Sequence, residues 1–89
     1  MGGLIEGVWE RIVKNEGEVF KQKRGKEFSY SVKMNTLYLR TTNRIISKKT
    51  FEKALDEVPL ENTVPLQNLQ APSYLYAILM DNRIRKDDY

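Results

Sequence analysis

The alternation of apolar and polar residues between positions 27 and 41 constrains the fold of this chain more than any other feature. Residues 27–33, EFSYSVK, place an apolar side chain at every second position. Residues 36–41 repeat the pattern, with Leu37 and Leu39 opposed to Tyr38 and Arg40. A period of two residues is typical of a strand with one buried face. Both segments are therefore predicted to be strands.

Short turns flank these strands. Residues 23–26, KRGK, predict a tight turn in which Gly25 takes a positive φ, and residues 34–35 predict a second one. Connections this short cannot cross over to a parallel neighbour. Together with the short, mixed segment 18–22, the pattern predicts a three-stranded antiparallel β-meander.

Helical patterns lie on both sides of the meander. Residues 4–15, LIEGVWERIVKN, carry apolar side chains at the three- and four-residue spacing of an amphipathic helix. Ser47 is a favourable N-cap for a short helix that ends at Pro59. Pro72 suits the first turn of a last helix, and residues 74–80, YLYAILM, are apolar nearly all round, as in a helix packed on several sides.

The predicted class is α+β, with an N-terminal helix, a three-stranded antiparallel β-meander and two C-terminal helices packed on one face of the sheet. A length of 89 residues is typical of one small domain. Residues 59–71 are predicted to form an ordered loop, and residues 83–89 a frayed tail in which Ile84 alone can reach the core. The predicted core consists of Ile5, Val8, Trp9, Ile12, Phe28, Tyr30, Val32, Phe51, Leu55, Leu75, Ile78 and Leu79.

The net charge of +3 conceals an uneven distribution along the chain. Residues 21–53 contain ten basic residues and only two acidic ones, Glu27 and Glu52, so this segment carries +8. The residues before it carry −2 and those after it carry −3. Because the basic segment includes the predicted strands, we expect the charge to lie on a folded surface rather than on a tail.

The residue inventory argues against most catalytic schemes. The chain has no histidine and no cysteine, which removes Ser-His-Asp and Cys-His arrangements, thiolate metal sites and disulfides. Gly17 and Gly25-Lys26 are too far apart for a phosphate-binding P-loop. We therefore expect no enzymatic activity, no cofactor and no metal site.

Basic residues interleaved with an aromatic residue on a sheet favour nucleic acid as the partner. Phosphate neutralisation requires several converging cations, and an exposed aromatic ring can stack on an unpaired base. Lys48 and Lys49 fall in the first turn of a helix, where cations oppose the helix dipole but backbone N–H groups attract a phosphate. The candidate nucleic-acid-binding residues are Lys21, Lys23, Arg24, Lys26, Lys33, Tyr38, Arg40, Arg44, Lys48 and Lys49.

Two other interpretations remain open. Lysine-rich strands and turns often serve only to keep a sheet solvated and to prevent edge pairing. Alternatively, the chain is a protein-interaction or regulatory module that docks on an acidic or apolar protein surface, and a contiguous exposed patch of Leu66, Leu69, Tyr74 and Tyr76 would favour this. The chain shows neither a signal-peptide pattern nor an apolar run long enough to cross a bilayer, so we expect a cytoplasmic protein with no membrane contact.

Overall fold

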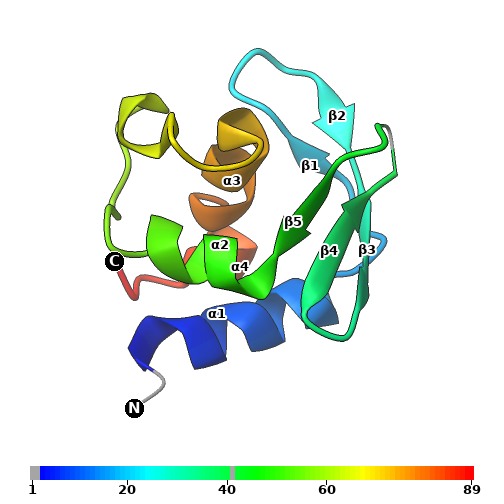
Figure 1. Ribbon diagram of the computed structural model, residues 1–89, viewed down its shortest axis with the longest axis horizontal. Helices are drawn as coiled ribbons and strands as arrows, with labels where there is room; N and C mark the ends of the chain where they lie inside the picture. Colours follow the sequence, from blue (N-terminus) through cyan, green and yellow to red (C-terminus); the bar gives the residue numbers. More distant parts are fainter. Residues whose placement is uncertain (1–2, 41) are drawn as a thin grey trace.

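The computed structural model describes residues 3–40 and 42–89, which form an α+β fold with four α-helices and two antiparallel sheets (Figure 1). The predicted class is therefore confirmed. Thr41, at the end of a predicted strand, lies outside the described residues. The elements in chain order are α1 (Gly3–Lys14), β1 (Phe20–Lys21), β2 (Glu27–Phe28), β3 (Tyr30–Lys33), β4 (Thr36–Leu39), β5 (Ile45–Ser47), α2 (Lys48–Ala54), the 3-10 turn η1 (Val64–Leu66), α3 (Pro72–Leu79) and α4 (Asn82–Arg85).

The larger sheet has the strand order β3-β4-β5, and every pairing is antiparallel. Its inner face carries Tyr30, Leu37, Leu39 and Ile46, all buried, and the helices lie on this side (Figure 1). β5 was not predicted from the sequence. Its three residues are too few to show a period of two, and the adjacent pair Ile45-Ile46 hides the alternation, although only Ile46 is buried.

The smaller sheet is the hairpin β1–β2, so the predicted single meander is wrong at its first strand. Phe20 pairs with Phe28, but beyond Ser29 the backbone N–H of Gly17 donates to the carbonyl of Tyr30 at 3.0 Å. The register of the hairpin would instead place Glu18 opposite Tyr30, so the ladder slips by one residue. This offset divides the predicted strand 27–33 into β2 and β3.

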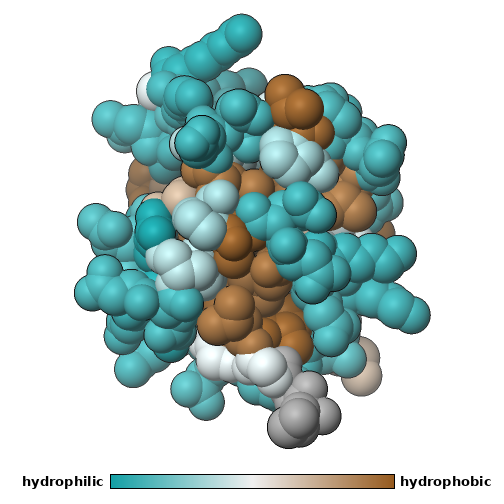
Figure 2. All heavy atoms as spheres, turned by 90° about the vertical axis from the view of Figure 1, so that its left-hand side faces the viewer, coloured by the Kyte–Doolittle hydropathy of each residue, from teal (hydrophilic) through white to brown (hydrophobic). Residues whose placement is uncertain are grey.

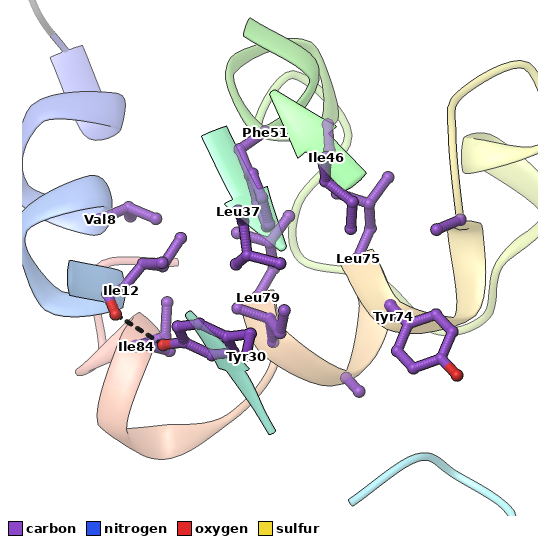
Figure 3. Close-up of a cluster of buried hydrophobic side chains, with 14 of the residues drawn as sticks. Val8, Ile12, Tyr30, Leu37, Ile46, Phe51, Tyr74, Leu75, Leu79 and Ile84 are labelled. Carbon is purple, nitrogen blue, oxygen red and sulfur yellow. Dashed lines mark hydrogen bonds between the residues drawn. The ribbon is translucent and has the colours of Figure 1, made fainter. Parts of the chain in front are cut away.

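The core forms where α1, α2 and α3 meet the inner face of the larger sheet. Figure 3 shows Ile12 of α1, Tyr30 of β3 and Ile84 of α4 pointing toward one another, with Leu79 beside them. Eleven of the twelve predicted core residues are buried, and Val32 is partly buried against the core. The buried apolar residues outside that set of twelve are Phe20, Leu37, Leu39, Ile46, Ala54, Leu60, Leu66, Ala71, Tyr74, Ala77 and Ile84.

The C-terminal residues pack as a folded element, in contrast to the predicted frayed tail. The side chain of Ile84 is 0% exposed, and the guanidinium of Arg11 donates to the Ile84 carbonyl at 2.7 Å. The Arg83 guanidinium lies 4.0 Å from the centre of the Phe20 ring, and the Tyr89 hydroxyl donates to the carbonyl of Leu79 at 2.6 Å. These contacts connect the tail to α1, β1 and α3, which a local pattern of mostly charged residues does not reveal.

The buried hydroxyl of Tyr30 and the partly buried hydroxyl of Tyr89 give the fold a predictable response to alkali. Burial raises the pKa of Tyr89 to about 12 from 10.0 and also raises the pKa of Tyr30, whose hydroxyl donates to the Ile12 carbonyl at 2.6 Å (Figure 3). Between pH 10 and 12 the unfolded chain therefore loses phenolic protons that the folded chain retains. We expect the free energy of unfolding to fall across this window, by about 1.4 kcal/mol per pH unit for each phenol that differs fully.

Urea denaturation at a series of pH values between 8 and 12 measures this dependence, with pH 8 as the reference. Tyr89→Phe removes one of the two groups, so its stability should decline less steeply than that of the wild type. A Tyr89→Phe protein with the same alkaline slope as the wild type would contradict the assignment of the raised pKa to the Tyr89 phenol.

None of the helices in residues 3–40 and 42–89 is long and apolar enough to cross a membrane.

Candidate nucleic-acid interface

The outer face of the larger sheet brings three of the candidate residues together. In the register of the sheet, Lys33 pairs with Thr36, and Tyr38 lies between Ser31 on one neighbouring strand and Ile45 on the other. Arg40 continues the same alternation beyond β4, and its N–H donates to the Ser29 carbonyl at 3.1 Å. We call the following residues the outer sheet face: Ser29, Ser31, Lys33, Thr36, Tyr38, Arg40, Ile45 and Ser47.

Tyr38 occupies the middle of the outer sheet face because β4 is the central strand. Its side chain remains 40% exposed, whereas the next residues along the strand, Leu37 and Leu39, are buried. Lys33 and Arg40 lie toward opposite ends of the same face. The outer sheet face has no acidic residue among its own members, but carboxylates lie at its margins. The Glu16 carboxylate accepts from the Val32 N–H at 2.8 Å, and Glu6 and Glu52 line one hollow with Thr36 and Ser47.

The β1–β2 hairpin lies beyond the Arg40 end of the outer sheet face and carries four more candidates, one on β1 and three in its turn. The turn is closed by the Gly25 N–H, which donates to the Gln22 carbonyl at 2.7 Å, and Gly25 has φ 91° as predicted. Lys21, Lys23, Arg24 and Lys26 are all exposed. Glu27 is the cross-strand partner of Lys21, so it offsets part of the charge at the base of the hairpin.

Lys23 turns away from the outer sheet face toward α3. Its ammonium lies 5.6 Å from the centre of the Tyr76 ring and 3.4 Å from the carbonyl of Glu61. Packing of Phe28 against Tyr74, edge to face at 4.9 Å between ring centres, holds the hairpin beside this helix.

A cleft of about 420 Å³ opens between the hairpin turn, α3 and the loop that follows α2. Its lining consists of Gln22, Lys23, Arg24, Asn62, Thr63, Ser73 and Tyr76.

Lys48 and Lys49 lie apart from the hairpin, at the end of the sheet that is next to α1 (Figure 1). The Lys48 ammonium is 3.6 Å from the carboxylate of Glu6, and Glu52 lines the same hollow. Their basic charge is therefore partly offset by carboxylates. Because Thr36 and Ser47 of the outer sheet face line the same hollow, the two lysines border the Lys33 end of that face and lie away from the hairpin turn.

The start of α2 has fewer backbone donors available for a phosphate than the sequence suggests. Ser47 caps the helix as predicted, with its hydroxyl accepting from the Thr50 N–H at 3.2 Å. The N–H of Lys48 donates to the Asn35 carbonyl at 2.8 Å. Two of the backbone donors that a phosphate would use are thus already bonded, and the helix has only seven residues.

Arg44 lies in the connection before β5, at the rim of a hollow that Asn43, Ile45, Gln70 and Ala71 also line. Its N–H donates to the Thr42 hydroxyl at 3.0 Å, and its side chain is exposed. The Leu39 N–H donates to the Arg44 carbonyl at 3.1 Å, and because Leu39 is buried on the inner face, strand alternation places Arg44 off the outer sheet face, beside Gln70 and Ala71. The ten candidate residues therefore divide into three residues of the outer sheet face, four of the hairpin, the Lys48-Lys49 pair, and Arg44 at the hollow before β5.

The apolar patch that would favour a protein partner is not formed. Leu66 and Tyr74 are buried, and Leu69 and Tyr76 are only partly exposed. Apolar surface occurs elsewhere, since Figure 2 shows a strip of hydrophobic atoms between two hydrophilic flanks on the side away from β3 and β4. Gly3, Leu4, Ile5 and Leu55 line a hollow on the α1–α2 side together with Glu52 and Asp56.

Sequence reasoning found the cations and Tyr38, but it did not find the cleft. Asn62, Thr63 and Ser73 are isolated polar residues in a loop and at a helix start, and no local spacing connects them with the turn at 23–26.

Within residues 3–40 and 42–89 there is no cluster of three or more acidic, histidine or cysteine residues able to hold a metal ion. No family model, curated protein or solved structure matches this chain significantly.

Proposed function

We propose that this is a small non-enzymatic protein that binds nucleic acid through the outer sheet face and the adjoining hairpin turn. The observation that carries the proposal is the position of Tyr38, exposed in the middle of a sheet face with Lys33 and Arg40 on either side and no acidic residue among the members of that face. We assign no chemistry of its own to the protein, because it lacks the side chains that most commonly act as general base or nucleophile near neutral pH.

The spacing of these residues suits a single strand. Successive residues on one face of a strand are roughly 6.5–7 Å apart, so a ring at Tyr38 and a cation at Arg40 can contact a base and a neighbouring phosphate together. Aromatic rings stack on any base, while cations that neutralise phosphates supply sequence-independent affinity. A duplex keeps its bases stacked inside, so Tyr38 would contribute little to its binding. The protein should prefer single-stranded nucleic acid.

Replacing Tyr38 with leucine tests this preference. Loss of one stacked base should cost about 1–3 kcal/mol, or roughly 5- to 150-fold in affinity for a single strand, with little change for a duplex. Tyr38→Phe is the matched control, because it keeps the ring and should bind within about twofold of the wild type. Fluorescence anisotropy with labelled single- and double-stranded oligonucleotides measures both affinities.

Each outcome separates the proposal from its rivals. Equal losses for single strands and duplexes would show that Tyr38 does not stack on a base. If neither single strands nor duplexes bound at low salt, the basic surface would be only a solvated sheet face. The protein-interaction module would then be the better proposal, with the apolar strip of Figure 2 as its docking surface.

A further inference from the structure

The cleft beside the hairpin turn combines cations, polar side chains and one aromatic ring, and no carboxylate lines it. Lys23 and Arg24 come from the turn, Asn62 and Thr63 from the loop after α2, and Tyr76 from α3. Its volume of about 420 Å³ lies within the range of about 300–1,000 Å³ that is typical of small-ligand sites. The cleft is therefore large enough for a ligand of nucleotide size.

Several polar groups in the cleft have no role in holding the fold together. Within the described chain, the side chains of Arg24, Gln22 and Ser73 make no hydrogen bond or ion pair with other residues. The Asn62 side-chain oxygen accepts from the Val64 N–H at 2.9 Å, which leaves its amide group as a donor. Donors of this kind suit the oxygen atoms of a phosphate and the edge of a base.

Tyr76 joins this cleft to a second hollow on the other side of Lys23. The second hollow is lined by Lys21, Lys23, Tyr76, Ala77, Met80, Asp81 and Asn82. The carboxylate of Asp81 accepts two hydrogen bonds from the Arg83 guanidinium, at 2.9 and 3.0 Å. Burial favours the neutral acid, but these bonds outweigh it and hold the pKa of Asp81 below its usual value. Its negative charge is therefore directed at Arg83 rather than at a ligand.

We infer that this cleft binds a nucleoside phosphate, either free or as the phosphorylated end of a single strand. Arg24 and Lys23 contact the phosphate, the Tyr76 ring stacks on the base, and Ser73, Gln22 and Asn62 hydrogen-bond the ligand. The strand-end form rests on the proposed function, because β2 connects the hairpin turn, which lines the cleft, to Ser29 of the outer sheet face. The free-nucleotide form does not depend on it.

Oligothymidine bearing a phosphate at the 5′ end, at the 3′ end or at neither end provides the probes, together with thymidine monophosphate and inorganic phosphate. One of the phosphorylated strands should bind at least about tenfold more tightly than the unphosphorylated strand. Tyr76→Leu should abolish that preference and leave the affinity for the unphosphorylated strand unchanged, whereas Tyr76→Phe should retain it. Thermal unfolding of each variant shows whether the fold is preserved.

The free nucleotide forms the second arm of the experiment. Thymidine monophosphate that binds the wild type but not Tyr76→Leu, by isothermal titration calorimetry, supports the cleft even if no oligonucleotide binds, in which case only the proposed function fails. Equal affinity for all three oligonucleotides, with no binding of thymidine monophosphate, would overturn the cleft inference and leave the proposed function intact. Inorganic phosphate that competes as well as thymidine monophosphate would also overturn it, because the ring would then contribute nothing.

Discussion

Ile84→Ala is expected to lower the free energy of unfolding by about 2–5 kcal/mol, although the residue lies only five positions before the last residue of this sequence. The side chain is fully buried and lies next to Ile12 and Tyr30 (Figure 3). Deleting its methyl groups leaves a cavity that α1 and α3, both held by other contacts, cannot close. A chain of this size has about 5–13 kcal/mol of stability in total, so the loss is a large fraction of it.

The matched control is Ile45→Ala, because Ile45 is the same residue type but 47% exposed on the outer sheet face. It should cost less than about 1 kcal/mol. Urea denaturation followed by the fluorescence of Trp9, which packs against Phe51 in the core, reports both losses. If Ile84→Ala cost no more than Ile45→Ala, the C-terminal residues would be frayed, as the sequence pattern suggests, and the packing of α4 would be refuted.

The second large effect is expected from reversing the charge of the hairpin turn. Lys23→Glu, Arg24→Glu and Lys26→Glu together should weaken nucleic-acid binding roughly a hundredfold at low salt, because about three phosphate contacts are lost. The fold should survive, since all three side chains are exposed and their only described contacts with other residues are those of Lys23 with Tyr76 and Glu61. Anisotropy with a labelled single strand gives the affinity, and circular dichroism gives the melting temperature.

A control with the same change in net charge separates local contact from general repulsion. Lys14, Lys53 and Lys86 are exposed and lie on α1, α2 and the C-terminal turn, outside the proposed surface. Their triple reversal to glutamate should reduce affinity much less than the hairpin variant does. If both triple variants lost the same affinity, net charge rather than the hairpin would govern binding.

The sequence predicted those parts of the fold whose signal is local. The stripe on α1, the Ser47 cap and the turn glycine Gly25 each follow from the spacing or conformational preference of neighbouring residues, and the structure confirms them. β5 and α4 were not predicted because they contain three and four residues, little more than one repeat of a strand or helix pattern. β5 is stabilised instead by pairing with β4, and α4 by contacts with α1, which is distant in sequence.

The candidate site was predictable to a similar extent. Strand alternation placed Lys33, Tyr38 and Arg40 on one face, because a period of two determines on which side of the sheet each side chain lies. Position in the sequence could not show that Glu6 on α1 pairs with Lys48, a contact that partly offsets the charge of this lysine. The cleft around Tyr76 likewise depends on three segments that only the tertiary structure brings together.

The salt dependence of binding by the wild-type protein tests the central claim most directly. Affinity for a labelled single-stranded oligonucleotide would be measured by fluorescence anisotropy from low to physiological salt. If about four to six cations of the outer sheet face and hairpin turn contact phosphates, the logarithm of affinity should fall linearly with the logarithm of salt, with a slope of about −3 to −4. No binding at low salt, or an affinity that does not change with salt, would contradict the assignment of this surface to nucleic acid.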